Sequence, residues 1–183
     1  MPRSAYAYIN RKKGGVEMKL YLVQHGLSLP EEVDPEKSLS PKGEAKSKKS
    51  AAFLREKNIR VGHIWHSSKK RAVQTAQIMA ESLSSPETQE RKGLNPMDPV
   101  GDFPGEIEAL KKDLMIVGHL PFVQKLASLL LSGTGDKNLI SVRNSGIICL
   151  EHTDSWKVLW IVTPELLEGQ GSQAEFDSSK FGC

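Results

Sequence analysis

Short apolar runs rich in β-forming residues alternate with helical patterns along this chain, and this alternation restricts the fold more than any other feature of the sequence. The strand-like runs are residues 19–25, 61–66, 113–118, 145–150 and 156–162. Such alternation is typical of an α/β domain with a largely parallel sheet. The last two runs are separated only by a short polar segment, so they are expected to form a hairpin that adds one antiparallel edge.

A capping residue followed by proline marks the first helix. Ser40 precedes Pro41, which suits the first helical turn, and the pattern predicts a helix over residues 41–57. Its inward face is expected to carry Ala45, Ala52 and Phe53. Further helices are expected over residues 69–83, with Ala72, Ala76 and Met79 on one face, over residues 106–112, and from Pro121 onward.

The length and composition favour a single globular domain. With 183 residues, we expect a flexible leader over 1–17, one domain over 18–168 and a disordered tail over 169–183. The formal charge of +3 gives little support to a nucleic-acid or membrane partner. Two cysteines form no disulfide framework, and no stretch is apolar enough to cross a membrane. A cytoplasmic location is therefore expected.

Two histidines follow predicted strands directly. His25 comes after the first run and His119 after the run at 113–118, and parallel strands bring their carboxyl ends to one edge of a sheet. Either histidine alone is better explained as a hydrogen-bonded residue at a strand end. Together with Arg71, in the first turn of a predicted helix, they would surround an anion, because a guanidinium matches two phosphate oxygens. The helix that opens at Pro121 adds favourable N–H groups beside His119.

Three segments carry a resemblance to a known family. They are LVQHG at 22–26, SSKKRAVQTA at 67–76 and VGHLPFV at 117–123. In this order they resemble the signature segments of the histidine phosphatase superfamily, and the compact length resembles its SixA-type phosphohistidine phosphatases more than phosphoglycerate mutases. The resemblance implies a three-layer α/β/α fold with a largely parallel sheet, the phosphoglycerate mutase-like fold.

The resemblance also implies an activity. His25 would be transiently phosphorylated, while Arg71 and His119 bind the phosphoryl oxygens, with no metal or other cofactor. Substrates would be phosphohistidine on a protein or a small phosphoester. Phosphoryl transfer depends mainly on positioning and on stabilising charge, which this set of side chains supplies.

One position departs from the family pattern, and the residue that would donate a proton is not identified by it. Gln24 stands where the family has an arginine, so the phosphate loses a charged partner; Arg143 is a candidate to replace it, or is simply an exposed loop residue. Asp98 is the nearest candidate for a proton donor, with Asp102 behind it, although the surrounding prolines and glycine also suit a turn.

Three other interpretations remain open on the sequence. Because of Gln24, the chain could be a weak phosphate-binding or regulatory member of the same fold. A metal-dependent hydrolase would need His25, His66 and His119 as ligands, but no HExxH motif supports it. A nucleic-acid interface on the lysine-rich helix 42–57 lacks aromatic residues for stacking.

Overall fold

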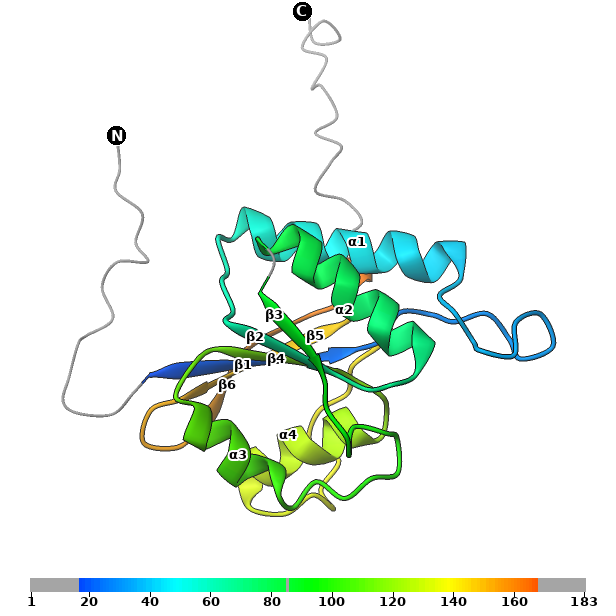
Figure 1. The fold of residues 1–183 in the computed structure, drawn as a ribbon. Helices are drawn as coiled ribbons and strands as arrows, with labels where there is room; N and C mark the ends of the chain where they lie inside the picture. Colours follow the sequence, from blue (N-terminus) through cyan, green and yellow to red (C-terminus); the bar gives the residue numbers. More distant parts are fainter. Residues whose placement is uncertain (1–16, 85, 168–183) are drawn as a thin grey trace, which may run out of the picture.

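Six strands form one mixed sheet at the centre of the fold (Figure 1). The structure, a computed structural model, describes residues 17–84 and 86–167, so the predicted leader and tail lie almost entirely outside the described residues. The strands are β1 (Met18–Gln24), β2 (His63–His66), β3 (Glu87–Glu90), β4 (Leu114–Gly118), β5 (Ile147–His152) and β6 (Trp156–Val162). Their spatial order is β3-β2-β4-β1-β5-β6.

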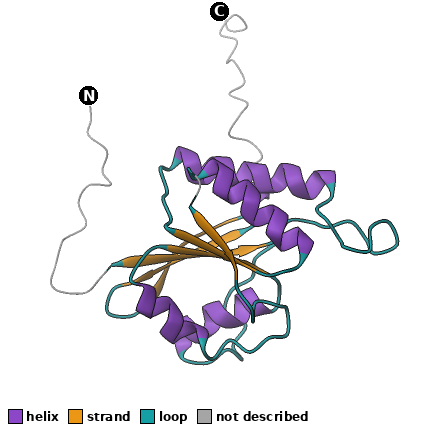
Figure 2. Ribbon diagram, viewed as in Figure 1, coloured by secondary structure: helices purple, strands orange, loops and turns teal. Residues whose placement is uncertain are grey.

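Helices cover both faces of this sheet. They are α1 (Pro41–Glu56), α2 (Lys70–Ser82), α3 (Phe103–Leu110) and α4 (Phe122–Ser132), followed by the short 3-10 helix η2 (Pro164–Leu167). Figures 1 and 2 show α1 and α2 on one face and α3 and α4 on the other. The predicted three-layer α/β/α fold is therefore confirmed.

The pairing pattern matches the predicted parallel sheet with an antiparallel addition. Strands β1, β2, β3 and β4 pair in parallel, and β5 runs antiparallel to both β1 and β6. Strands β5 and β6 are joined by residues 153–155, as the predicted hairpin requires. The edge strands are β3 and β6, whereas β5, which alone reverses direction, lies inside the sheet.

Alternate residues of β1 supply the two halves of the core. Leu20 and Leu22 pack in one buried cluster with residues of α3 and α4, while Tyr21 and Val23 pack in the other with residues of α1 and α2. This is the two-residue period of a strand buried on both faces. The central strand is thus held between helices on either side, and its carboxyl end is placed rigidly.

One strand and one helix face differ from the predictions. The sequence ETQE of β3 has no apolar alternation, and all four residues are exposed, so no pattern marks it as a strand. The predicted inward face of α1 is wrong at Ala45, which is exposed, whereas Ala52 is half-buried and Phe53, also half-buried, packs against the core as predicted. The buried residues of α1 are instead Gly43, Ser47, Ser50, Ala51 and Leu54.

Small residues are needed where α1 meets the chain that leaves β1. The Ser40 side chain caps the helix by accepting from the Gly43 N–H at 3.0 Å, as predicted. Leu27 crosses so closely that a Cβ at position 43 would lie 2.0 Å from its carbonyl oxygen. Gly26 is similarly confined, since a Cβ there would lie 2.6 Å from Ser47 Oγ. Gly26 therefore permits a close approach rather than an unusual φ angle.

Replacing Gly43 by alanine should destabilise the fold by at least about 1–3 kcal/mol, the usual cost of overpacking, although alanine is the better helix former. Gly105 is a matched control, since it is also the third residue of its helix and has open space around its Cβ position. Gly105→Ala should stabilise by about 0.4–1 kcal/mol. Denaturant unfolding measures both changes, and equal effects of the two substitutions would contradict the packing argument.

Candidate active site

The carboxyl ends of three neighbouring strands bring together the residues that the sequence singled out. Strand β4 lies between β1 and β2, with Gln24 opposite Gly118 and His66 opposite Val117. The backbone pairing continues one residue further, because the His25 N–H donates to the Gly118 carbonyl at 3.0 Å and the Ser67 N–H donates to the Val117 carbonyl at 3.2 Å. His119, the residue after β4, therefore lies between His25 and Ser67.

The predicted histidine pair and arginine meet at this edge. The ring centroids of His25 and His119 are 4.7 Å apart. Arg71, in the first turn of α2, donates from Nε to His25 Nε2 at 3.2 Å. Three side chains that are far apart in the sequence thus form one cluster, as predicted, with a guanidinium hydrogen-bonded to one imidazole and a second imidazole beside it.

The protonation of the His25 ring follows from its contacts. Its Nδ1 lies 2.7 Å from the Gly26 carbonyl oxygen, which can only accept a hydrogen bond, so Nδ1 carries the proton. Its Nε2 accepts from Arg71 and therefore presents a lone pair. A nucleophilic nitrogen with this geometry needs no separate base to remove a proton.

Burial keeps both rings neutral near neutral pH. Desolvation lowers the pKa of His25 to about 4, against the hydrogen bond to Gly26, which raises it, and with a further lowering from the Arg71 charge. Burial likewise lowers the pKa of His119 to about 3, assisted by repulsion from His25, Arg71 and Lys69. The positive charge of the cluster is thus supplied by the guanidinium and not by the imidazoles.

A buried loop residue supports the backbone beneath His25. Ser145 has φ +60° and is fully buried, and its N–H lies 3.0 Å from the Gln24 carbonyl oxygen and 3.3 Å from that of His25. The Ser145 Oγ bonds Ser47 at 2.9 Å, and the Ser145 carbonyl accepts from Ser50 at 2.6 Å. The buried serines of α1 therefore have polar partners, which explains why an apolar pattern did not find this helix face.

Two further side chains hold the turn after β1. Asn144 Nδ2 donates to the His25 carbonyl at 3.0 Å. Thr75 Oγ1 accepts from the Gly26 N–H at 3.0 Å and donates to the Arg71 carbonyl at 2.7 Å, which links the turn after His25 to the helix that carries Arg71. Sequence reasoning missed both residues; the polar Asn-Ser-Gly run before β5 and the position of Thr75 one helical turn after Arg71 were the available signals.

The remaining predicted site residues lie at different places. Gln24 is 5% exposed, and its Oε1 is buried with no hydrogen-bond partner. Arg143 is exposed in the loop before β5, and only its carbonyl has a described bond, from the Gly146 N–H. Asp98 Oδ2 accepts from the Asn95 N–H at 2.8 Å, a turn contact, and no contact links its carboxylate to His25. A role for Asp98 as proton donor remains a prediction.

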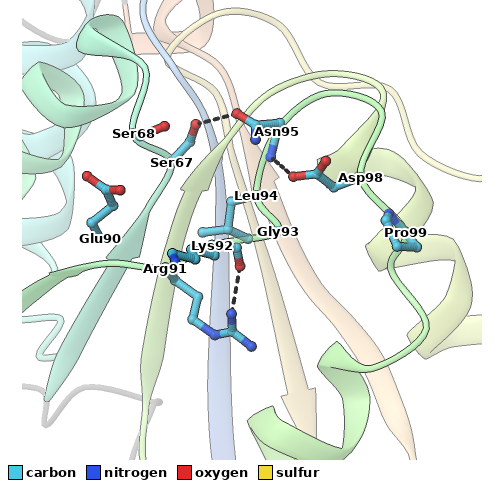
Figure 3. Close-up of a pocket in the computed structure, with 10 residues that line it drawn as sticks. All are labelled: Ser67, Ser68, Glu90, Arg91, Lys92, Gly93, Leu94, Asn95, Asp98 and Pro99. Atoms are coloured by element: carbon cyan, nitrogen blue, oxygen red, sulfur yellow. Dashed lines mark hydrogen bonds between the residues drawn. The ribbon is translucent and has the colours of Figure 1, made fainter.

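A polar groove adjoins the cluster on the side of Ser67. Its volume is about 420 Å³, and it is lined by Ser67, Ser68 and residues from Glu90 to Pro99 (Figure 3). Ser67 lines the groove and also contacts His119 Nε2 through Oγ at 2.9 Å, so the groove lies directly beside the imidazole cluster. The groove begins where the edge strand β3 ends.

The described residues contain no metal-ligand cluster. Among residues 17–84 and 86–167, no group of three or more His, Cys, Asp or Glu side chains is placed to hold a metal ion. His66, a ligand in the metal-hydrolase alternative, instead contacts the Ser67 carbonyl through Nδ1 at 3.0 Å. Within the same part of the chain, no helix is both long and apolar enough to span a membrane.

Comparison with known proteins agrees with this geometry. The family model of the histidine phosphatase superfamily (branch 1) matches residues 20–115, more than half of the chain. This chain belongs to the histidine phosphatase superfamily. The match contains most of β1, all of β2 and the segments with His25 and Arg71, whereas His119 lies just beyond it.

Individual relatives extend the likeness to most of the chain. An uncharacterized protein of Picosynechococcus sp. (strain ATCC 27264 / PCC 7002 / PR-6) is 29% identical over 165 residues, which cover 82% of this chain and 99% of that protein. The protein histidine phosphatase SixA complexed with tungstate is similar in structure, with a TM-score of 0.75 and 21% identity over 82% of this chain and 99% of SixA. A phosphoserine phosphatase mutant from Entamoeba histolytica in complex with phosphoserine gives a TM-score of 0.64 and 14% identity over 81% of this chain and 98% of its own. These structures share the fold of this superfamily member.

The His25 imidazole should titrate well below the ordinary histidine range, because protonation would place a charge in a buried site beside Arg71. We expect a midpoint near pH 4 instead of 6.5, so His25 stays neutral as the pH falls through 6 and becomes charged only near 4. The titration of its ring protons by NMR, assigned with His25→Ala, measures this value. A midpoint near 6.5 would contradict the buried, neutral nucleophile.

Proposed function

We propose that this protein is a metal-independent phosphatase that removes phosphoryl groups from phosphohistidine on proteins, through a phosphohistidine intermediate on its own His25. The observation that carries the proposal is the state of His25 Nε2. The lone pair of Nε2 accepts a hydrogen bond from Arg71 Nε, while the Gly26 carbonyl keeps the proton on Nδ1. Membership of the histidine phosphatase superfamily supports the same assignment.

The proposed reaction has two steps. In the first, His25 Nε2 attacks phosphorus in line, a new P–N bond forms, and the bond to the leaving group breaks with its electron pair on that group. Arg71 then bonds phosphoryl oxygens instead of Nε2, and His119 adds a second donor. In the second step water attacks phosphorus, the P–N bond to Nε2 breaks, and inorganic phosphate leaves.

The proposed leaving group explains why the site needs no carboxylic acid close to His25. An alkoxide leaving group needs a proton donor, whereas the imidazole of phosphohistidine leaves readily once it is protonated near neutral pH. Asp98 is the proposed donor where one is needed, from its place in the groove beside Ser67. A site without a close carboxylic acid therefore suits a phosphoramidate better than a phosphoester.

The groove beside Ser67 favours a phosphoprotein over a small molecule. It is open and polar, and backbone as well as side-chain groups line it between Arg91 and Asn95. A polypeptide flanking the phosphorylated side chain offers many amide groups for such a surface, whereas a small phosphoester would leave it empty. We therefore propose a phosphorylated protein of the cytoplasm as the substrate.

The proposal is tested with a phosphohistidine-bearing protein and with p-nitrophenyl phosphate, each with and without EDTA. We expect hydrolysis of both that resists EDTA, with a higher kcat/KM for the phosphohistidine substrate. His25→Ala should abolish turnover, because it removes the attacking nitrogen, and should abolish the acid-labile phosphoenzyme. His66→Ala is the matched control, since this histidine lies at a neighbouring strand end without contacting Arg71, and it should retain activity. Loss of activity with EDTA, or activity in His25→Ala, would contradict the mechanism.

Gln24 favours a second candidate, a phosphate-binding member of the fold with little turnover. A neutral amide stands next to the nucleophile where the family pattern has an arginine, and its Oε1 is buried without a partner. A charged hydrogen bond is worth about 1.5–3 kcal/mol, so its loss lowers the rate by roughly ten- to a hundredfold. Phosphate binding without turnover of either substrate would support this candidate.

Introducing the missing charge should raise turnover. Gln24→Arg is expected to increase kcat/KM by roughly ten- to a hundredfold through one more charged bond to the phosphoryl group. Because the position is buried, the unpaired arginine should also lower the free energy of unfolding without phosphate and recover part of it when phosphate binds. Gln24→Met controls for the change of shape. Unchanged or lower kcat/KM in a folded Gln24→Arg protein would show that the site requires the amide.

A further inference from the structure

Two buried side-chain atoms in the described part of the chain have no hydrogen-bond partner, and both lie beside His25. They are Gln24 Oε1 and His119 Nδ1. His119 is only 1% exposed, so its unpaired ring nitrogen is a costly feature for a structural residue. A buried polar atom left without a partner at the edge of a phosphoryl site indicates that a ligand atom completes its bonding.

The other nitrogen of the His119 ring is occupied. Its Nε2 lies 2.9 Å from Ser67 Oγ, and Ser67 is itself only 1% exposed. The position of this hydroxyl is determined by the sheet, because the Ser67 N–H continues the pairing of β2 with β4. The ring of His119 is therefore held from a neighbouring strand and not from its own.

The distances around Ser67 Oγ decide where its single hydrogen lies. Oγ already accepts from the Lys69 N–H at 3.3 Å. Its two possible acceptors are His119 Nε2 at 2.9 Å and Asn95 Oδ1 at 3.4 Å, and the second distance is beyond the ordinary range for a hydroxyl bond. The hydroxyl thus donates to Nε2, which leaves the His119 proton on Nδ1.

We propose that Ser67 is a positioning residue, which holds His119 in the Nδ1–H tautomer and directs that N–H toward the bound phosphoryl group. The proposal rests on the proposed function, since a phosphoryl oxygen is the acceptor that completes Nδ1. In the opposite tautomer an Nδ1 lone pair would face the phosphoryl oxygens and repel them. A neutral histidine can serve as a donor here only if its other nitrogen is kept free of hydrogen.

The loop that contains Asn95 and Asp98, and that lines the groove, in turn contacts Ser67. Figure 3 shows Asn95 between Ser67 and Asp98, with Asn95 Oδ1 facing Ser67 and the Asn95 N–H bonded to Asp98 Oδ2 at 2.8 Å. Asp98 thus fixes the turn that carries Asn95, and Asn95 limits the movement of the Ser67 hydroxyl. A continuous series of contacts thus runs from Asp98 in the groove through Asn95 and Ser67 to the His119 ring.

The tautomer is measured directly on the full chain without substrate, by long-range ¹H–¹⁵N NMR of the imidazoles at neutral pH, with His119→Asn used for assignment. We expect Nδ1 of His119 to be protonated and Nε2 to be bare in the native protein. Ser67→Ala should produce a mixture of tautomers or the opposite one, and Ser67→Thr, which keeps the hydroxyl, should preserve the native one. Ser68→Ala removes an exposed hydroxyl one residue away that does not contact His119, and it should leave the His119 tautomer unchanged.

Binding of inorganic phosphate, measured by calorimetry, gives a second readout. Ser67→Ala should weaken it about two- to tenfold, the fold-change of one neutral hydrogen bond, and Ser67→Thr should restore it. A native His119 with its proton on Nε2, or a Ser67→Ala protein with unchanged tautomer and phosphate affinity, would overturn the proposal. If the tautomer and phosphate binding depend on Ser67 while no substrate is turned over, the positioning role stands and the proposed phosphatase activity fails.

Discussion

The parallel pairing of β4 with both β1 and β2 is the constraint on which the rest of the site depends. Neighbouring strands are about 4.8 Å apart, so residues that follow three adjacent strands lie along a line of about 10 Å, the size of a phosphoryl group with its partners. His119 occupies the middle of that line, between His25 and Ser67. If β2 and β4 exchanged places, His119 would lie one strand further from His25, and their rings could not approach.

Hydrogen bonds from several elements hold the backbone at this edge of the sheet. The turn after β1 is fixed from three directions, by Asn144 at the His25 carbonyl, by Thr75 from α2, and by Ser145 with the buried serines of α1. Each contact satisfies a buried polar group that would otherwise cost free energy. The buried face of α1 is therefore polar where it meets the site and apolar elsewhere, and its serines help to fix the backbone beneath His25.

Most of the fold and the central three side chains could be predicted from the sequence, because both depend on local patterns. His25 and His119 each follow an apolar strand directly, Arg71 lies in the first helical turn after the next strand, and strand ends can be located from hydrophobic runs. Strand β3 could not be found, since ETQE is exposed throughout and is a strand only because β2 pairs with it. The contact between Ser67 and His119 was equally hidden, because it depends on the register between β2 and β4, although both residues lie in segments that the sequence singled out.

The neutral surroundings of the nucleophile fit a reactive substrate. Two imidazoles with lowered pKa values and the uncharged Gln24 leave Arg71 as the charged group that touches His25. Little charge is needed when the bond that breaks is a labile P–N bond, because a better leaving group lowers the barrier that electrostatic stabilisation must otherwise lower. A stable phosphoester would demand both the second arginine and a nearby acid. The departure at position 24 therefore fits the phosphohistidine substrate proposed above, with Arg71 as the charged partner of His25 and Ser67 as the proposed positioning residue for His119.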